Sequence, residues 1–326
     1  MARHLVHRAT AVFAASLMLA GCVSTQAGRI GFDDGRDACR PQLLALDSTG
    51  DFYGEQILQG AAVGALTGAL VGGLATGRWQ GALIGAAVGG AGGAAVGYYA
   101  ALQRQAGDQQ ALVLQLSGDL GRENAQLDRT LVAFNGLMDC RLNAADQIRL
   151  TVRNGRLDRS TAQAQLTEIR ARFINDVALA QSINGRIAAR GAEFDTAIDA
   201  SVPGGKAAIQ TASLRRPPVR VAPRRPVDIK FSPSPTSASI GTVAAGSVVA
   251  VRPGPPGFTE VQTASGVRGY APADAFPTQR GTVAPEARDG DVRSLAATNI
   301  SRRENFAASV NNAERLAQAG GFELTS

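Results

Sequence analysis

The sequence predicts a multi-module α+β protein: a glycine-rich helical hairpin, then a long helical hairpin or coiled coil, then a small all-β barrel. Three observations predict this fold class. No proline lies between Pro41 and Pro203, and thirteen of the fourteen prolines lie from Pro203 onward. Glycine recurs every four residues before residue 100, and short apolar runs broken by Pro and Gly fill residues 227–279. Because proline breaks helix interiors, we expect long helices in the first half of the chain and a largely non-helical second half.

Shifts in composition divide the chain into seven segments. They are a signal peptide (1–21), an N-terminal segment (22–55), the glycine-rich hairpin (56–103), the helical hairpin or coiled coil (104–202), a Pro/Arg-rich linker (203–226), the β module (227–279) and a tail with a weak helix (280–326).

The N-terminus has the features of a secretion signal. Arg3 and Arg8 make a basic start, and the apolar run from Ala11 to Ala20 is too short to span a bilayer. The run leads into the string LAGC, which resembles the bacterial lipobox and implies that Cys22 is acylated and becomes the first mature residue. An ordinary signal peptide with a chance cysteine is the alternative. Val23, in place of an aspartate, favours the outer membrane, with the chain facing the periplasm.

Composition argues against several classes of function. Both histidines, His4 and His7, lie in the signal peptide, so the mature chain lacks the usual base for catalysis and the usual metal ligand. There is no GxSxG string and no Cys–His pairing. We therefore expect no enzyme, no catalytic residue, no metal and no cofactor, although carboxylate-only chemistry stays open. The formal charge of +6 is mild and partly lies in the signal peptide, so we expect no nucleic-acid binding.

The segment from Gln56 to Gln103 has a single charge, Arg78, and a regular glycine spacing. On a helix, this spacing makes a groove without side chains in which another backbone can approach closely. Two registers are present: Gly60, Gly64, Gly68 and Gly72, then Gly73, Gly77, Gly81, Gly85, Gly89, Gly93 and Gly97. The repeat resembles the glycine-zipper two-helix family of outer-membrane lipoproteins, which implies helix packing within a membrane.

The two arms of this hairpin, about 57–76 and 81–100, would each be about 30 Å long, which matches a hydrocarbon core. The aromatic pairs Phe52–Tyr53 and Tyr98–Tyr99 would meet at one end, with Trp79 at the other, as aromatic belts do at membrane interfaces. A hairpin packed on itself without crossing a membrane is the alternative.

Residues 104–202 have helical periodicity and polar composition. One apolar stripe is interrupted by Arg141, a turn is expected at Asn154-Gly155, and a second stripe follows. The first stripe comprises Leu127, Leu131, Phe134, Met138, Ala145 and Ile148; the second runs through Phe173, Val177, Ala180, Asn184, Ile187, Gly191, Phe194 and Ile198. The first arm could form a stalk of about 66 Å.

The β module contains five short strand candidates, which predict a small barrel. They are 227–231, 239–243, 247–251, 258–261 and 268–271. The strings IGTV, GSVV, GFTEV and GYA resemble the bacterial SH3 domain, in which two Trp commonly stand at the positions of Phe258 and Tyr270. The resemblance implies a glycan- or peptide-binding module with these two rings in a ligand groove. A structural barrel with core aromatics is the alternative.

The flanking segments carry weaker signals. The linker has five arginines between residues 215 and 225 and is expected to be an extended, solvated spacer, with binding of anionic glycan or phospholipid as the alternative. The tail predicts an amphipathic helix through Phe306, Val310, Ala313 and Leu316.

We expect Cys39 and Cys140 to form a disulfide, because two thiols in an oxidising compartment pair more often than they catalyse. A hairpin between them would bring their flanks together. Residues 37–47 could form a short helix that packs beside Cys140, with three leucines inward, Leu43, Leu44 and Leu46. Two buried, reduced thiols are the alternative.

Together these features predict a lipid-anchored envelope protein with a structural, tethering or wall-binding role. Its expected partners are membrane lipid, peptidoglycan or a cell-wall peptide, and further copies of the chain through the zipper. A zipper oligomer that forms a pore or surrounds an outer-membrane protein is the second hypothesis, and a wall-targeted hydrolase is the third.

Overall fold

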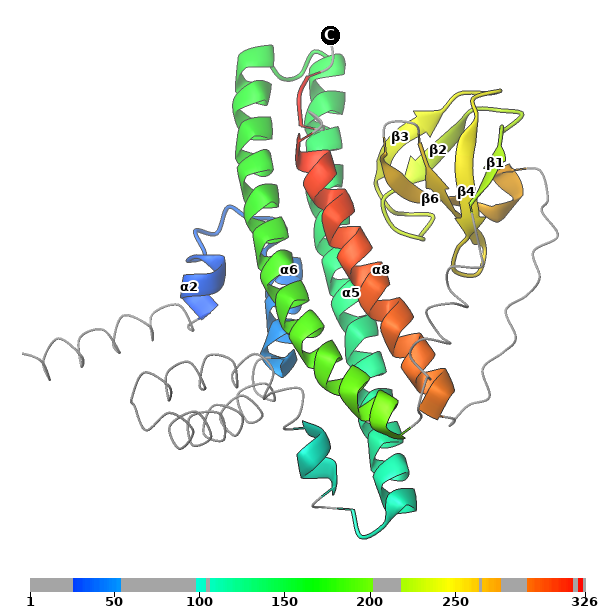
Figure 1. The fold of residues 1–326 in the computed structure, drawn as a ribbon. Coiled ribbons are helices and arrows are strands. Elements are labelled where there is room, and N and C mark those ends of the chain that lie inside the picture. The colour runs from blue at the N-terminus through cyan, green and yellow to red at the C-terminus, as the bar shows by residue number, and fades with distance from the viewer. Residues whose placement is uncertain are drawn as a thin grey trace, which may run out of the picture.

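The computed structural model describes residues 26–53, 98–103, 106–201, 218–263, 266–276, 292–318 and 322–324. Within this part of the chain, three long helices lie side by side and a β module lies against them (Figure 1). Cys22, the eleven zipper glycines and Trp79 lie outside the described residues, so acylation and glycine packing stay predictions.

The expected helical hairpin is formed by α5 (Gln109–Arg153) and α6 (Arg159–Ser201). Asp108 and Asp158 precede the two helices, and each accepts a hydrogen bond at 2.8 Å from the backbone N–H three residues later. These N-caps satisfy donors that a helix start leaves free. Gly155 occupies the turn with φ +66°, a conformation that glycine adopts without a steric penalty.

The tail helix lies where the sequence predicted a weak amphipathic helix, but it is firmly packed. Helix α8 (Val292–Gln318) lies along α5 and α6 and buries all four of its predicted apolar positions. It runs parallel to α5: Asn124 donates to the carbonyl of Leu295 near its start, and Arg149 donates to Glu323 just beyond its end. The helical region is therefore a three-helix bundle, and a two-helix stalk is too simple a description.

The interior of the bundle has two apolar clusters. The large cluster includes Leu127, Phe134, Met138, Phe173, Val177, Ile187, Phe306 and Val310. The small cluster is Leu102, Leu112, Leu116, Leu120, Phe194, Ala197, Ile198, Val292 and Ala296. Between them along the helices lie five buried polar residues, here named the polar layer: Glu123, Asn124, Arg190, Glu193 and Asn299.

The β module is a six-stranded antiparallel sheet with the order β1-β4-β5-β6-β2-β3. Its interior is made of valines, Ile229, Ala271 and Phe276, and a short 3-10 helix, η1 (Ala273–Ala275), follows the last strand. The strands are β1 (Val219–Val221), β2 (Val227–Lys230), β3 (Ser239–Val243), β4 (Val249–Pro253), β5 (Phe258–Gln262) and β6 (Arg268–Pro272).

The sheet corrects two expectations. It is open, with β1 and β3 at its edges, so a closed SH3-like barrel is not confirmed. Residues 219–221, predicted to be linker, form strand β1, because a short Val-Arg-Val run pairs with β4 despite the prolines around it. Between β6 and β2 only Lys230 and Tyr270 are paired. Gly269 permits this close crossing, since a Cβ there would lie 2.4 Å from the Ile229 side chain.

Candidate functional site

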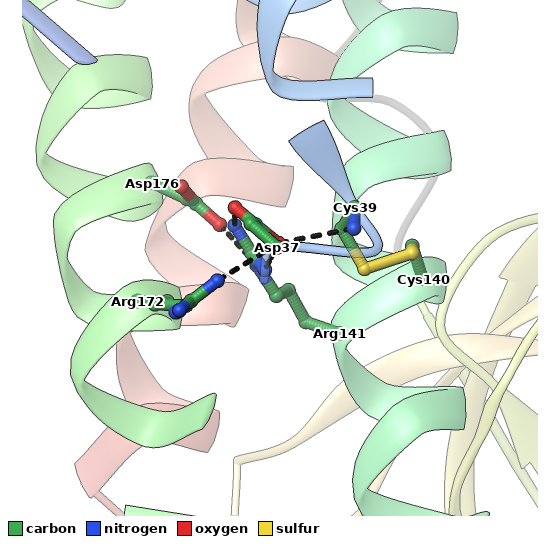
Figure 2. Close-up of a disulfide and its surroundings, with 6 residues drawn as sticks. All are labelled: Asp37, Cys39, Cys140, Arg141, Arg172 and Asp176. Carbon is green, nitrogen blue, oxygen red and sulfur yellow. Dashed lines mark hydrogen bonds and ion pairs between the residues drawn. A yellow bond between two sulfur atoms is a disulfide. The ribbon is translucent and has the colours of Figure 1, made fainter. Parts of the chain in front are cut away.

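Three consecutive residues of α5 connect the separate parts of the molecule. Asp139 contacts the β module. Cys140 is bonded to the N-terminal segment, and Arg141 reaches both that segment and α6 (Figure 2). We call Asp139, Cys140 and Arg141 the hub. Successive residues on a helix point in different directions, so one turn of α5 holds three neighbours.

The structure joins Cys39 and Cys140 in a disulfide, with their Cα atoms 5.9 Å apart. This bond links positions 101 residues apart, so it attaches the start of helix 40–53 to the middle of α5. Leu43 and Leu46 of that helix are buried beside it, as expected. Leu44 is 36% exposed, because its position lies on the outer side of the helix.

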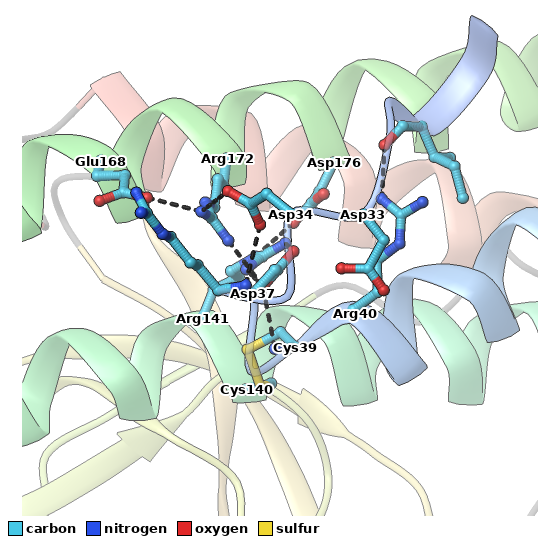
Figure 3. A network of polar contacts seen from close by, with 12 residues as sticks. Asp33, Asp34, Asp37, Cys39, Arg40, Cys140, Arg141, Glu168, Arg172 and Asp176 are labelled. Atoms are coloured by element: carbon cyan, nitrogen blue, oxygen red, sulfur yellow. Dashed lines mark hydrogen bonds and ion pairs between the residues drawn. A yellow bond between two sulfur atoms is a disulfide. The ribbon is translucent and has the colours of Figure 1, made fainter. Parts of the chain in front are cut away.

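Arg141 is the centre of a buried ion-pair network. Its Nε donates to Asp176 of α6 at 2.7 Å, and its Nη atoms donate to both oxygens of Asp37. Arg172 of α6 lies on the other side of Asp37 at 3.4 Å and also pairs with Glu168 at 2.6 Å (Figure 3). Because Arg141 and Asp176 are 4% and 3% exposed, removing either partner would leave a charge buried and uncompensated.

The two carboxylates of this network have opposite pKa shifts. Burial raises the pKa of Asp176 to about 6, and the hydrogen bond from Arg141 only partly offsets it. Burial also acts on Asp37, but two Arg141 hydrogen bonds, the Arg141 charge and the Cys39 N–H outweigh it and lower the pKa of Asp37. Asp37 is therefore the more firmly ionised partner of Arg141.

Asp139 holds the loop between β2 and β3. One carboxylate oxygen accepts from the Ser237 hydroxyl at 2.6 Å and from the Ala238 N–H at 3.1 Å, and the other accepts from the Ser232 hydroxyl at 2.9 Å. Phe231, which precedes this loop, packs against Phe134 of α5 with ring centroids 6.2 Å apart. The β module is therefore fixed to the bundle by polar and apolar contacts together.

A second polar contact attaches the β module to α8. The Asn312 side chain donates to the carbonyl of Arg268 at 2.7 Å and accepts from its N–H at 3.0 Å. Tyr270, two residues on, shares a small pocket with the α8 residues Asn305 and Ser309. Burial is the main cause that raises the pKa of the Tyr270 phenol.

This packing bears on the expected ligand groove. Phe258 and Tyr270 lie on the same face of neighbouring strands, since Phe258 pairs with Pro272 and Tyr270 with Glu260. However, α8 borders Tyr270, so a ligand over both rings would have to fit beside the bundle. A groove over Phe258 and Tyr270 stays a prediction.

The structure also shows how the two ends of the glycine-rich region are held. We call residues 54–97 the zipper segment; helix 40–53 precedes it and the helical residues 98–103 follow it. In helix 40–53, Tyr53 is fully buried and its hydroxyl lies 3.2 Å from that of Thr130 on α5. Gly50 packs so closely on Ile183 of α6 that a Cβ would lie 3.1 Å from that side chain.

The second end contacts the same two helices. The Tyr98 hydroxyl donates to Asp119 of α5 at 2.7 Å, and its ring packs edge-on against Phe194 of α6 with centroids 5.0 Å apart. Leu102 is buried in the small cluster. The α5 contacts of the two ends, Thr130 and Asp119, are eleven residues apart, which corresponds to about 16 Å of helix.

These contacts correct the expected aromatic belt. Tyr53 and Tyr98 pack on the bundle, Tyr99 lies against the small cluster, and the Arg190 guanidinium lies over the Phe52 ring at 5.2 Å. The four aromatic residues therefore attach the zipper ends to protein, where a membrane interface was expected. Among the helices that the structure describes, none combines the length and the apolar character needed to cross a membrane.

Sequence reasoning identified the disulfide but missed the charged residues around it. One signal was present: Arg141 interrupts an otherwise apolar stripe, and a charge at such a position needs a partner. Asp37 and Asp176 could not be assigned as those partners, because they come from segments 104 and 35 residues away. Asp139 and Asn312 carried no signal, since isolated polar residues are usual on helices.

The described residues contain no group of three or more Cys, Asp or Glu side chains placed to hold a metal ion. The network around Arg141 alternates cations and carboxylates, so its charges are already compensated within the protein. Such an arrangement connects segments rigidly.

Comparison with known proteins gives one match. The family described as YMGG-like Gly-zipper matches residues 42–101. The match begins inside helix 40–53 and ends inside 98–103, so both of its ends lie in residues that pack on the bundle. It points to an association with a membrane or the cell envelope. No curated protein and no solved structure matches the chain.

Proposed function

We propose that the protein is an envelope lipoprotein that acts as a structural tether, with the three-helix bundle as a rigid connector between a membrane-embedded zipper segment and the β module. The observation that supports this most strongly is that both ends of the zipper segment pack on α5 and α6. A hairpin held at both ends transmits its position to the bundle. A hairpin attached through flexible chain would move independently of the bundle and could not hold it in place.

The N-terminal anchor adds a second attachment at the same place. Only four positions separate Cys22 from Gln26, the first residue of α2 (Gln26–Ile30). Arg29 of α2 pairs with the buried Asp47 of helix 40–53 at 2.7 Å. Acylated Cys22 would therefore lie close to the first end of the zipper segment. One acyl chain binds a membrane only weakly, so two attachments together give a stable association.

In this proposal the β module is held away from the anchor and directed toward the wall. The contacts through Asp139 and Asn312 fix its position on the bundle, so the distance from the membrane is set by folded structure. Its partners would be peptidoglycan or a cell-wall peptide, and the chain would have no catalytic role and no cofactor.

Membrane attachment can be tested by fractionation of cells that express four versions of the full chain. They are wild type, Cys22→Ala, a variant in which 54–97 is replaced by a short Gly/Ser loop, and the combination of both changes. We expect each single change to leave much of the protein in the membrane fraction and the combination to release it. The loop needs to bridge only about 16 Å, so the bundle stays folded.

Two results would contradict the proposal. A combined variant that remains in the membrane would show that neither attachment is used. A detergent-extracted wild type that runs as a ring-sized assembly would favour the pore or surrounding oligomer, whereas a monomer supports the tether.

A further inference from the structure

A cavity of about 830 Å³ lies in the β module, on the side of β2 that faces β6. It is lined by residues 224–228, Lys230, Pro272 and residues 274–276. The cavity arises because β2 and β6 pair at Lys230 and Tyr270 and then separate. Continuing the ladder would put Pro226 opposite Asp274 and Asp228 opposite Pro272, and proline has no N–H to donate.

This separation leaves a stretch of β2 without a partner. On its other side β2 pairs with β3, from Val227 opposite Val243 to Lys230 opposite Ser239. Toward β6, the described part of the chain supplies no ladder partner for residues 227–229. Unpaired backbone groups at a strand edge can bind an added extended segment through main-chain hydrogen bonds. Buried Val227 and Phe276 supply an apolar floor.

The charge of the lining identifies the class of ligand. Three cations, Arg224, Arg225 and Lys230, line the cavity, and none of them forms an ion pair with another described residue. Two carboxylates, Asp228 and Asp274, also line the cavity. Asp228 accepts a hydrogen bond from Thr242 on the β3 side at 2.9 Å. Arginines bind carboxylates through paired hydrogen bonds, so the site favours a ligand that carries them.

We propose that this cavity binds a short extended peptide that carries carboxylates, with its backbone along β2 and its carboxylates at Arg224, Arg225 and Lys230. The volume lies within the range typical of small-ligand sites, about 300–1,000 Å³. The site would give the β module of the proposed tether its ligand. Binding in solution needs no membrane, so this inference and the tether can fail separately.

The test is titration calorimetry of the full-length chain, purified in detergent, with the tetrapeptide acetyl-Ala-Ala-Glu-Ala bearing a free C-terminal carboxylate. We expect saturable binding and no binding of the neutral peptide acetyl-Ala-Ala-Gln-Ala amide. The pair Arg224→Ala and Arg225→Ala should weaken binding about tenfold or more, because charge-assisted hydrogen bonds are lost. The matched control pair, Arg220→Ala and Arg252→Ala, removes equal charge outside the cavity and should leave binding unchanged.

A third arm uses inorganic phosphate. Phosphate that binds as tightly as the acidic peptide would overturn the peptide assignment and leave a general anion site. Absence of peptide binding, or equal loss in the control pair, would overturn the proposal altogether. Circular dichroism of both double variants checks that the fold is kept, and since all four arginines are exposed we expect unchanged spectra.

Discussion

The hub and the polar layer are polar clusters of one bundle, each with buried charged groups, but they differ in how completely their groups are paired. At the hub, Arg141 bonds to two carboxylates, and the neighbouring cysteines are joined. In the polar layer, both amide atoms of Asn299 and one oxygen each of Asn124 and Glu193 have no hydrogen-bond partner among the described residues. A paired cluster fixes segments firmly, whereas an incompletely paired one weakens the contact between the two apolar clusters beside it.

The largest expected effect is the loss of Arg141. Arg141→Met removes the partner of buried Asp176 and should lower the free energy of unfolding by about 3–5 kcal/mol. Denaturant melts of the purified protein measure this. Adding Asp176→Leu should restore a large part of the loss, because no uncompensated charge then remains at that position. Arg122→Ala is the exposed control and should change stability by less than about 0.5 kcal/mol. A double variant less stable than the single one would contradict this account.

The disulfide ranks next. Replacing Cys39 and Cys140 together by Ser should lower the free energy of unfolding by about 2–4 kcal/mol, because the bond closes a long loop in the unfolded chain. The same melts in the presence and absence of reductant supply the check. Reductant should destabilise the wild type and leave the double serine variant unaffected. If the wild type is also insensitive while a thiol reagent detects Cys39, the two cysteines are not paired.

Two asparagines of α8 sharpen the comparison. Asn299 is fully buried, and its side-chain amide has no hydrogen-bond partner within the described part of the chain, so Asn299→Leu should raise the free energy of unfolding by about 1 kcal/mol. Asn312 is also buried but makes two backbone hydrogen bonds to β6, so Asn312→Leu should lower it by about 1–3 kcal/mol. Thermal melts of both variants compare them directly, and a loss of similar size in the two would refute the distinction.

The smallest effect is a pH dependence in the polar layer. Burial raises the pKa of Glu193 to about 7. The positive charge of Arg190 lowers this pKa in part, and the negative charge of Glu123 raises it further. A raised carboxyl pKa means that stability is lost as pH rises from about 4.5 through 7. Glu193→Gln should therefore match the wild type near pH 5 and exceed it near pH 8. Equal melting temperatures at both pH values would show that Glu193 ionises without penalty.

Local sequence patterns predicted most of the helices and strands. They could not predict which residues that are far apart in the sequence contact each other in the fold. The stripes of α5 and α6, the turn at Gly155 and five of the six strands follow from periodicity and turn residues. Strand β1 was missed because three residues among prolines carry little signal. The aromatic residues at the zipper ends were assigned to a membrane interface, since composition alone does not distinguish a lipid surface from a protein one.

The polar residues of α8 explain why the tail helix was expected to be weak. Its apolar positions were found, but arginines and asparagines between them made the helix look weak. In the structure Arg303 pairs with Asp195 of α6 at 2.6 Å and crosses Gly191, where any Cβ would clash with the guanidinium. Such pairing between distant segments makes a polar position compatible with packing, and it is visible only once the helices are placed together.

The central claim is that the bundle holds both ends of the zipper segment, and hydrogen exchange of the full-length chain in detergent tests it most directly. We predict that amides of residues 98–103 and of helix 40–53 are both protected. In Phe194→Ala, which removes the ring against Tyr98, protection should fall in 98–103 and persist in 40–53. Exchange of 98–103 at the rate of an unstructured peptide in the wild type would contradict the claim.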